Sequence, residues 1–342
     1  MKSTTYDIAT AQNSHVSMVF NASAGFSATS VSAQTTAKGR AWKHHYFPSR
    51  VVTAVRSGKS HVVGIIVPNV QANFFSTIIH CIEDGLKDEG YRIIIYQSNE
   101  SLENEIKGVE TLLEAHVDGI MASISLETQS GSHFSGLINQ NKPLIFFDRV
   151  DETLPVPTVT VDDFEAGYCA TQHLIEQGYQ KIAFITTSHQ VKIFSERLRG
   201  YKTALTKNGF PLVLEHILFG GLSIKDGRFG AGKLMRARNK PDAIIAGDDF
   251  TALGVIKKLK EIDLTPPEIG VVGFANEAFS SYITPTLTMI DQHAPQIGRA
   301  CAQMFLKMVR RKNPYEEIDH VVLSPNLIAR QTSSRNSEVP NA

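Results

Sequence analysis

The sequence has little cysteine and no long hydrophobic run, and each shortage excludes a class of protein. Its three cysteines, Cys81, Cys169 and Cys301, are far apart along 342 residues. No pair has the spacing of a metal or redox site, and an odd number argues against a disulfide framework. A reducing cytoplasm fits this usage. No apolar run approaches the ~20 residues that a membrane span needs, so we expect no membrane partner.

Residues 16–33 are rich in Ala, Ser and Val, as signal peptides are, but they lack a hydrophobic centre. Their longest apolar run is Met18–Phe20, whereas the h-region of a signal peptide needs about seven apolar residues. We therefore expect a cytoplasmic protein rather than a secreted one.

The first 60 residues differ in composition from the rest. They contain no leucine and no glutamate, and they carry seven Lys or Arg against one acid, Asp7. The remaining residues carry 27 basic against 33 acidic side chains. The net charge of zero is therefore the sum of a basic N-terminal segment, the head, and an acidic remainder. Such a head suits a segment that binds a polyanion. The alternative is a solvated basic arm.

From residue 61 onward, short β-branched runs alternate with helical patterns. Alternation of this kind predicts βαβ units and buried parallel sheets, an α/β fold. In the helical segment after the first run, Phe74, Ile78, Ile82 and Leu86 share one face. The expected strands lie at 61–68, 91–98, 117–124, 143–150 and 158–162, and then at 181–187, 216–221, 243–249 and 268–275.

Three helical patterns end in a glycine followed shortly by the next strand. Gly90, Gly178 and Gly209 can each adopt the left-handed conformation that stops a helix. Two series of strands joined by extended segments predict two lobes with a cleft between them. Ligands of open α/β sheets bind beyond the carboxyl ends of the strands, so facing lobes would share one ligand.

Five blocks occur in an order that is typical of one family. They are VGIIVPNVQANFF (63–75), ERLRGYKTAL (196–205), AIIAGDDFTALG (243–254), VVGFANEAFSSYITPTLTMIDQ (271–292) and PNLIARQTS (325–333). With these blocks, the chain from about residue 46 to residue 332 resembles the lactose-repressor (LacI/GalR) family of transcription regulators. The resemblance implies two periplasmic-binding-protein-like lobes, each a parallel sheet flanked by helices, behind a small all-α helix-turn-helix headpiece. It also implies a homodimer.

The resemblance sets expected boundaries. The headpiece would span 1–48 and the hinge 49–60. The N-terminal lobe would comprise 61–162 and 292–320, and the C-terminal lobe 163–291 and 321–332. Residues 333–342 are polar, and we expect them to be disordered.

The headpiece departs from the family pattern. Tyr6 to Ala9 match its start, and Val16, Ser17 and Asn21 match the far end of its recognition helix, but the segment between is a few residues shorter. Met18 stands where the family has an arginine, either as helix core or as a lost base contact. The segment 49–55 resembles the family's hinge helix. The resemblance implies DNA contacts at Tyr6, Ser17, Asn21, Ser32, Thr35, Tyr46, Arg50, Val51 and Val55.

In the lobes, the resemblance implies a site for a small sugar-like effector. Carboxylates, amides and an arginine can bond vicinal hydroxyls over an apolar face. The matching positions are Asn73, Phe74, Asp148, Arg149, Arg197, Asp248, Asn276 and Gln292.

Several of these positions have alternatives. Asp248 could bind ligand or cap the following helix, and Arg197 could bind ligand or form a surface salt bridge. Asp162 and Asp163 suit the crossover between lobes better than an acid–base pair. Gly247 and Ala275 replace polar residues of the family pattern, so the family's best-studied galactosides cannot be assumed as ligands.

GRFGAGKL (227–234) matches the start of a phosphate-binding loop, but Leu234 replaces the Ser or Thr that would hold Mg²⁺. The stretch follows a helix-start signal, SIKD, so Gly230 and Gly232 are expected inside a helix that carries Lys233 outward. His44 and His45 have no Cys or carboxylate nearby to complete a metal site. We expect no cofactor and no enzymatic activity.

The sequence therefore predicts a cytoplasmic, dimeric, ligand-responsive repressor whose partners are operator DNA, a small-molecule effector and a second copy of itself. The alternative is a sugar-binding sensor that has lost specific DNA binding, because the recognition segment is short. An exported sugar-binding protein is a weaker third reading.

Overall fold

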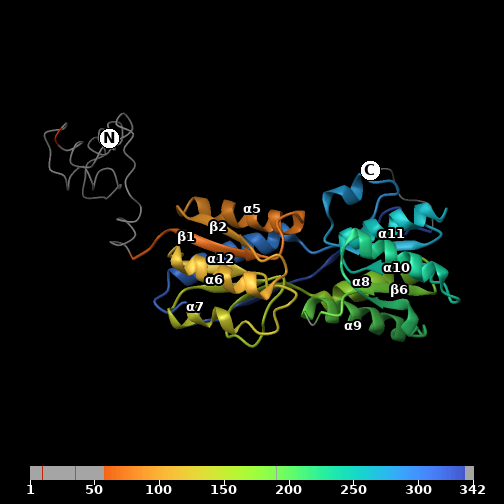
Figure 1. Cartoon of the computed structure of the whole chain (residues 1–342), viewed down its shortest axis with the longest axis horizontal. Coiled ribbons are helices and arrows are strands. Elements are labelled where there is room, and N and C mark those ends of the chain that lie inside the picture. Colours follow the sequence, from red (N-terminus) through yellow and green to blue (C-terminus); the bar gives the residue numbers. More distant parts are fainter. Residues whose placement is uncertain (1–9, 11–34, 36–57, 190, 336–342) are drawn as a thin grey trace. The chain divides into compact units, whose positions relative to one another are not determined.

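The computed structural model describes residues 10, 35, 58–189 and 191–335 (Figure 1). The chain divides into two compact units, Met1–Val62 and Val63–Ala342. In the first unit, Thr10 and Thr35 are helical and exposed. The other expected DNA contacts, and the rest of the headpiece and hinge up to residue 57, lie outside the described residues.

The first lobe is built on a six-stranded sheet in the order β11-β5-β4-β3-β1-β2. The pairings of β1 with β3, β3 with β4, β4 with β5 and β5 with β11 are all parallel. Parallel neighbours need crossover connections, which the helices between them provide. The strands are β1 (Val62–Val67), β2 (Arg92–Gln97), β3 (Gly119–Ala122), β4 (Leu144–Phe147), β5 (Thr158–Val161) and β11 (His320–Leu323).

Helices cover both faces of this sheet. Phe74, Ile78, Ile82 and Leu86 form the buried face of α5, as predicted from their spacing. They share one core with α12 and with β1, β4 and β5. In Figure 1, α5 and α6 lie on opposite sides of β1. The helices are α5 (Asn73–Lys87), α6 (Leu102–Glu114), η1 (Ser132–Phe134), α7 (Ser135–Asn139) and α12 (Ala294–Val309).

The second lobe repeats this plan with the order β12-β10-β9-β8-β6-β7. Its neighbouring strands pair in parallel, except that β12 runs antiparallel to β10. The strands are β6 (Ile182–Thr186), β7 (Ile217–Phe219), β8 (Ala243–Ala246), β9 (Gly270–Phe274), β10 (Thr288–Asp291) and β12 (Asn326–Ile328).

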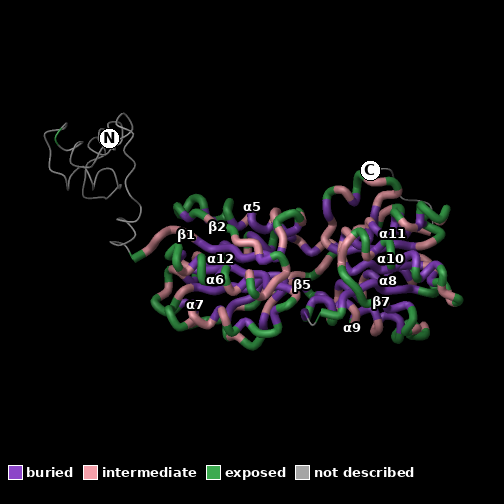
Figure 2. Tube along the Cα trace, viewed as in Figure 1, coloured by how far each residue is buried: buried purple, intermediate pink, exposed green. Residues whose placement is uncertain are grey.

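Alternate residues of these strands face two different helix pairs. Phe184 of β6 packs with α8 and α9, whereas Ile185 packs with α10 and α11. The strands are therefore buried on both sides, which explains their continuous apolar sequences (Figure 2). The elements are α8 (Asp163–Glu176), α9 (Lys192–Lys207), η2 (Leu214–His216), α10 (Ile224–Arg236), α11 (Asp249–Glu261) and η3 (Ala278–Ser281).

The nine strands expected from the sequence are all present, and the two-lobed α/β fold is confirmed. Gly90, Gly178 and Gly209 have φ values of 75°, 85° and 74° after helices, as predicted. Strands β10, β11 and β12 were not among the expected ones. Two boundaries are corrected. Residues 321–323 were expected in the C-terminal lobe, but β11 pairs with β5 in the first sheet. Ser333 was expected to begin a disordered tail, but it is fully buried and hydrogen-bonded to His173 and Thr288, at 2.7 Å each.

Candidate ligand-binding cavity

A cavity of about 270 Å³ lies between the lobes, next to the carboxyl ends of β1, β4, β8, β9 and β10. This is where open α/β sheets bind ligands. Its wall contains Asn69, Ala72, Phe74, Phe75, Glu100, Leu126, Asp148, Arg149, Ile193, Phe194, Arg197, Leu222, Gly247, Asp248, Asp249, Phe250, Ala275 and Gln292.

The structure brings together most of the ligand contacts expected from the sequence. Two expected residues lie outside the wall. The side chain of Asn73 contacts Glu277, and Asn276 is bonded to Arg330 and Asp291, at 2.9 Å and 3.3 Å. Those that line the cavity are Phe74, Asp148, Arg149, Arg197, Asp248 and Gln292.

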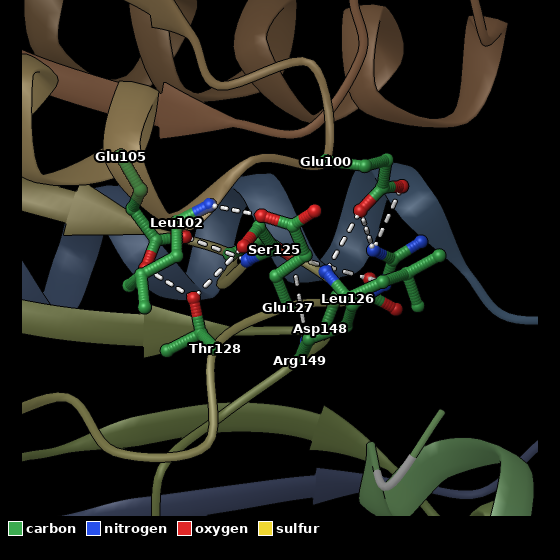
Figure 3. Close-up of polar contacts among 10 residues, drawn as sticks. Glu100, Leu102, Glu105, Ser125, Leu126, Glu127, Thr128, Asp148 and Arg149 are labelled. Atoms are coloured by element: carbon green, nitrogen blue, oxygen red, sulfur yellow. Dashed lines mark hydrogen bonds and ion pairs between the residues drawn. The ribbon is translucent and has the colours of Figure 1, made fainter. Parts of the chain in front are cut away.

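Arg149 is hydrogen-bonded to Glu100, a residue that no sequence pattern singles out. Its Nη1 donates to both carboxylate oxygens of Glu100, at 2.9 Å and 2.8 Å (Figure 3). Its Nε is buried and, among the described residues, has no hydrogen-bond partner. That N–H is therefore free to donate to an oxygen of a ligand.

Glu100 and Glu105 also order the loop that follows β3. The backbone N–H of Leu126 donates to Glu100 at 2.9 Å. Glu105, fully buried on α6, accepts from the N–H of Ser125 at 2.6 Å and from the hydroxyl of Thr128 at 2.7 Å (Figure 3). These bonds hold Leu126 at the cavity wall.

Arg197 reaches the cavity from α9 in the second lobe. Its Nε donates to Asp163 at 2.8 Å, and its Nη1 donates to the carbonyl of Gly247 at 3.1 Å. Its guanidinium lies 4.3 Å from the ring centroid of Phe274. Arg197 is only 3% exposed. It therefore forms a buried ion pair with Asp163 at the cavity wall, and not the surface salt bridge that was its alternative role.

Close packing of α8 and α9 sets the position of Arg197. A methyl group at Gly167 of α8 would overlap the backbone carbonyl of Arg197. Glycine therefore lets the two helix backbones approach, and Asp163, the first residue of α8, meets Arg197 as a result.

Four carboxyl groups near the cavity have raised pKa values because they are buried. Burial raises the pKa of Asp163 to about 6 and that of Asp249 to about 8, the latter helped by nearby Asp248 and Glu277. Burial also raises the pKa values of Asp148 and Asp248. Several carboxyl groups with shifted pKa values around one cavity indicate a functional site.

Asp248 performs the capping role considered for it. Its side chain accepts from the N–H of Thr251 at 2.7 Å, at the start of α11. It also lines the cavity, so capping leaves it available for a ligand as well. Asp162 caps α8 in the same way.

A second cavity of about 440 Å³ shares Asp148 and Ile193 with the first. Its wall includes Thr158 and Thr160 of β5 and Val322 of β11. No sequence pattern predicted this second cavity, because β11, which forms part of its wall, was not an expected strand.

The phosphate-loop match at 227–234 lies on helix α10, with Gly230 and Gly232 buried and Lys233 exposed, as predicted. Across the described ranges, no group of three or more His, Cys, Asp or Glu could hold a metal ion. Nor is any described helix long and apolar enough to cross a membrane.

Two curated proteins are similar to this chain over most of its length. Catabolite control protein A of Priestia megaterium is 29% identical over 269 residues, which cover 78% of this chain and 80% of that protein. The HTH-type transcriptional repressor PurR of Erwinia tasmaniensis is 27% identical over 298 residues, which cover 84% of each.

Solved structures agree. A LacI family regulator from Enterococcus faecium with bound ribose matches with a TM-score of 0.72 and 25% identity, covering 80% of this chain and 98% of that one. The lac repressor dimer bound to operator and the anti-inducer ONPF shares the fold, with a TM-score of 0.85 at 20% identity over 97% and 99% of the chains. The family model described as periplasmic binding proteins and sugar binding domain of LacI family matches residues 60–333. The chain belongs to this family.

Proposed function

We propose that this protein is a transcriptional repressor that binds a small sugar-like effector between its lobes and operator DNA through residues 1–48. The observation that carries the proposal is the interlobe cavity, where two arginines and four carboxylates converge beside apolar side chains. Such groups bond the hydroxyls of a sugar, while Phe74 and Phe194 cover its apolar face. The Enterococcus faecium relative was solved with ribose.

The effector contacts assigned here are Phe74, Asp148, Arg149, Arg197, Asp248 and Gln292. Asn73 and Asn276 are left out, because they lie outside the cavity wall and bond other side chains. The lobes are assigned as 61–162 with 292–323, and 163–291 with 324–333.

DNA recognition is assigned to Tyr6, Ser17, Asn21, Ser32, Thr35 and Tyr46 in the headpiece and to Arg50, Val51 and Val55 in the hinge. The excess of basic side chains in residues 1–60 supports this assignment, because each neutralised phosphate adds affinity. Curated relatives are named as transcriptional regulators and repressors. We propose that the protein has no enzymatic activity and that it is located in the cytoplasm.

The effector acts by binding one arrangement of the lobes better than another. Only such a difference in affinity can shift DNA binding. Arg149 of the first lobe and Arg197 of the second both face Phe194, at 5.9 Å and 5.8 Å from its ring centroid. A ligand held by both arginines would tie the two lobes together.

A homodimer is supported by large exposed apolar side chains of the second lobe. Phe229 on α10 is 70% exposed and Tyr282 after η3 is 85% exposed. Contiguous exposed apolar patches often mark protein interfaces, and we propose that these two side chains belong to such a patch. Sedimentation of the purified protein, with Phe229→Asp as the variant, measures the dimer and the contribution of this surface to it.

The experiment that tests the proposal is a titration of DNA from upstream of the protein's own gene, at two salt concentrations, with and without a panel of sugars. Saturable binding that resists competitor DNA and changes with one sugar supports a repressor. Weak binding that disappears as salt rises would contradict it.

A second candidate is a sugar sensor without specific DNA binding. The shortened segment between Asp7 and Asn21 favours it, because it removes residues from the reading helix. In that case sugar binding measured by calorimetry would persist while specific DNA binding would be absent.

A further inference from the structure

Helix α5 begins at the cavity wall without a side-chain cap of its own. Its N-cap residue, Ala72, has no side-chain oxygen to accept a hydrogen bond. The first N–H groups of a helix have no partner within the helix. Glu277 of the second lobe supplies one. Its Oε1 accepts from the N–H of Phe74 at 2.6 Å, across 203 residues of sequence. Glu277 is only 6% exposed.

The N-terminus of a helix is an anion-binding position, because its free N–H groups and its dipole both favour negative charge. Ala72, Phe74 and Phe75 line the cavity, so the first turn of α5 forms part of its wall. Glu277 is not itself a wall residue, but its carboxylate takes the N–H of Phe74, to which a phosphate or carboxylate of a ligand would otherwise bind.

The two cavity arginines are also neutralised by the protein. Arg149 is bonded to both oxygens of Glu100, and Arg197 is bonded to Asp163. The wall contains no lysine or histidine within the described residues. It does contain Asp148 and Asp248, which an incoming anion would meet as like charges.

From these contacts we infer that Glu277 determines ligand specificity: it fills the anion position at α5, so that the cavity accepts uncharged polyhydroxyl ligands and excludes phosphorylated or acidic ones. This inference rests on the proposed sugar-sensing function and narrows its ligand class. Arg149 still offers an N–H group to a neutral oxygen, since its buried Nε has no hydrogen-bond partner among the described residues and lies 3.9 Å from the carboxylate of Asp148. Hydroxyls can accept from this group and donate to the carboxylates.

The test compares four full-length proteins: wild type, Glu277→Ala, Glu277→Gln and Glu215→Ala. In Glu277→Gln an amide oxygen can still accept from Phe74. Glu215, exposed on η2 in the same lobe, gives the same change in net charge away from α5. Inorganic phosphate is titrated into each by calorimetry, at ionic strength held constant with chloride.

Wild type, Glu277→Gln and Glu215→Ala should show no saturable phosphate binding. Glu277→Ala should gain saturable phosphate binding, because the N–H groups and dipole at the start of α5 are then free to attract an anion. Saturable phosphate binding by wild type, or its absence in a natively folded Glu277→Ala protein, would overturn the inference. If the alanine variant fails to fold, Glu277→Asn takes its place, because its shorter neutral side chain cannot span to Phe74.

A paired titration separates this inference from the proposed function. Glucose and glucose 6-phosphate, and ribose and ribose 5-phosphate, are compared in wild type and Glu277→Ala. The preference for the neutral member should fall about tenfold in the variant. If neither wild type nor Glu277→Ala binds any of these sugars, the proposed sugar-sensing function is rejected. The gain of inorganic phosphate binding in Glu277→Ala would still decide the role of Glu277.

Discussion

Arg149 and Arg197 approach one cavity from opposite lobes, and each is hydrogen-bonded to one carboxylate, with Asp148 a further 3.9 Å ion-pair partner of Arg149, but their surroundings differ. The Arg197 and Asp163 side chains are 3% and 9% exposed, whereas those of Arg149 and Glu100 are 11% and 35% exposed. A buried pair depends on both partners, because either one alone would be an unpaired buried charge. A partly solvated pair can open at little cost. The second lobe therefore presents a fixed arginine, and the first lobe presents an adjustable one.

Removing the fixed arginine should have the largest effect. Arg197→Ala leaves Asp163 buried without its partner and should lower the free energy of unfolding by about 3–5 kcal/mol, measured by urea denaturation. It should also abolish the response to effector while the folded variant still binds DNA. Arg199→Ala, which removes an exposed arginine of the same helix, should change stability little.

The double variant Arg197→Ala/Asp163→Asn sharpens this prediction. Neutralising Asp163 removes the unpaired charge, so part of the lost stability should return. If the double variant is no more stable than Arg197→Ala, the ion pair is not the cause of the loss.

The helix contact behind Arg197 comes next. Gly167→Ala would push a methyl group into the carbonyl of Arg197 and should cost about 1–3 kcal/mol in thermal unfolding. It should weaken effector binding as well, because α9 carries Arg197. Gly136→Ala in α7 of the first lobe meets no atom within 4 Å and should be neutral or slightly stabilising. Equal losses in both variants would contradict the packing argument.

The acids of the second lobe should make stability depend on pH. The pKa of Asp249 is raised by burial to about 8, compared with about 3.9 in an unfolded chain. Between these values the folded state binds more protons, so the free energy of unfolding falls as pH rises toward 8. From pH 6 to pH 8 the fall from this residue should be about 2 kcal/mol. Asp249→Asn, an uncharged replacement, should remove that part of the slope.

The adjustable arginine should give the smallest effect. Glu100→Gln removes the charge opposite Arg149 and should cost about 0.5–1 kcal/mol, because the pair is partly solvated. Affinity for neutral sugars should change less than in Arg197→Ala. A loss as large as that of Arg197→Ala would remove the distinction between the two arginines.

Much of the fold could be predicted from the sequence, because buried parallel strands are continuous apolar runs. Nine strands were predicted on that pattern. Strands β11 and β12 were missed because they are only four and three residues long and every residue in them is exposed or intermediate rather than buried. Without β11, the boundary between the lobes was placed too early.

The cavity was predictable only in part. Residues directly after strands, such as Asp148 and Asp248, could be chosen because strand ends converge on a cleft. Glu100, Asp163 and Glu277 act through partners 49, 34 and 203 residues away, and no local pattern records such distances. Asn276 was misplaced because its amide is taken up by Arg330 and Asp291, both distant in sequence.

Helix α12 gives the chain an order of assembly during synthesis. It belongs to the core of the first lobe, where Ile297, Cys301 and Phe305 pack with α5. Yet it is translated after every strand of the second lobe except β12. The growing chain must therefore build most of the second lobe while the first still exposes the apolar face that α12 will cover. A nascent chain stalled before residue 294 should thus be a good substrate for chaperones that bind exposed hydrophobic surface.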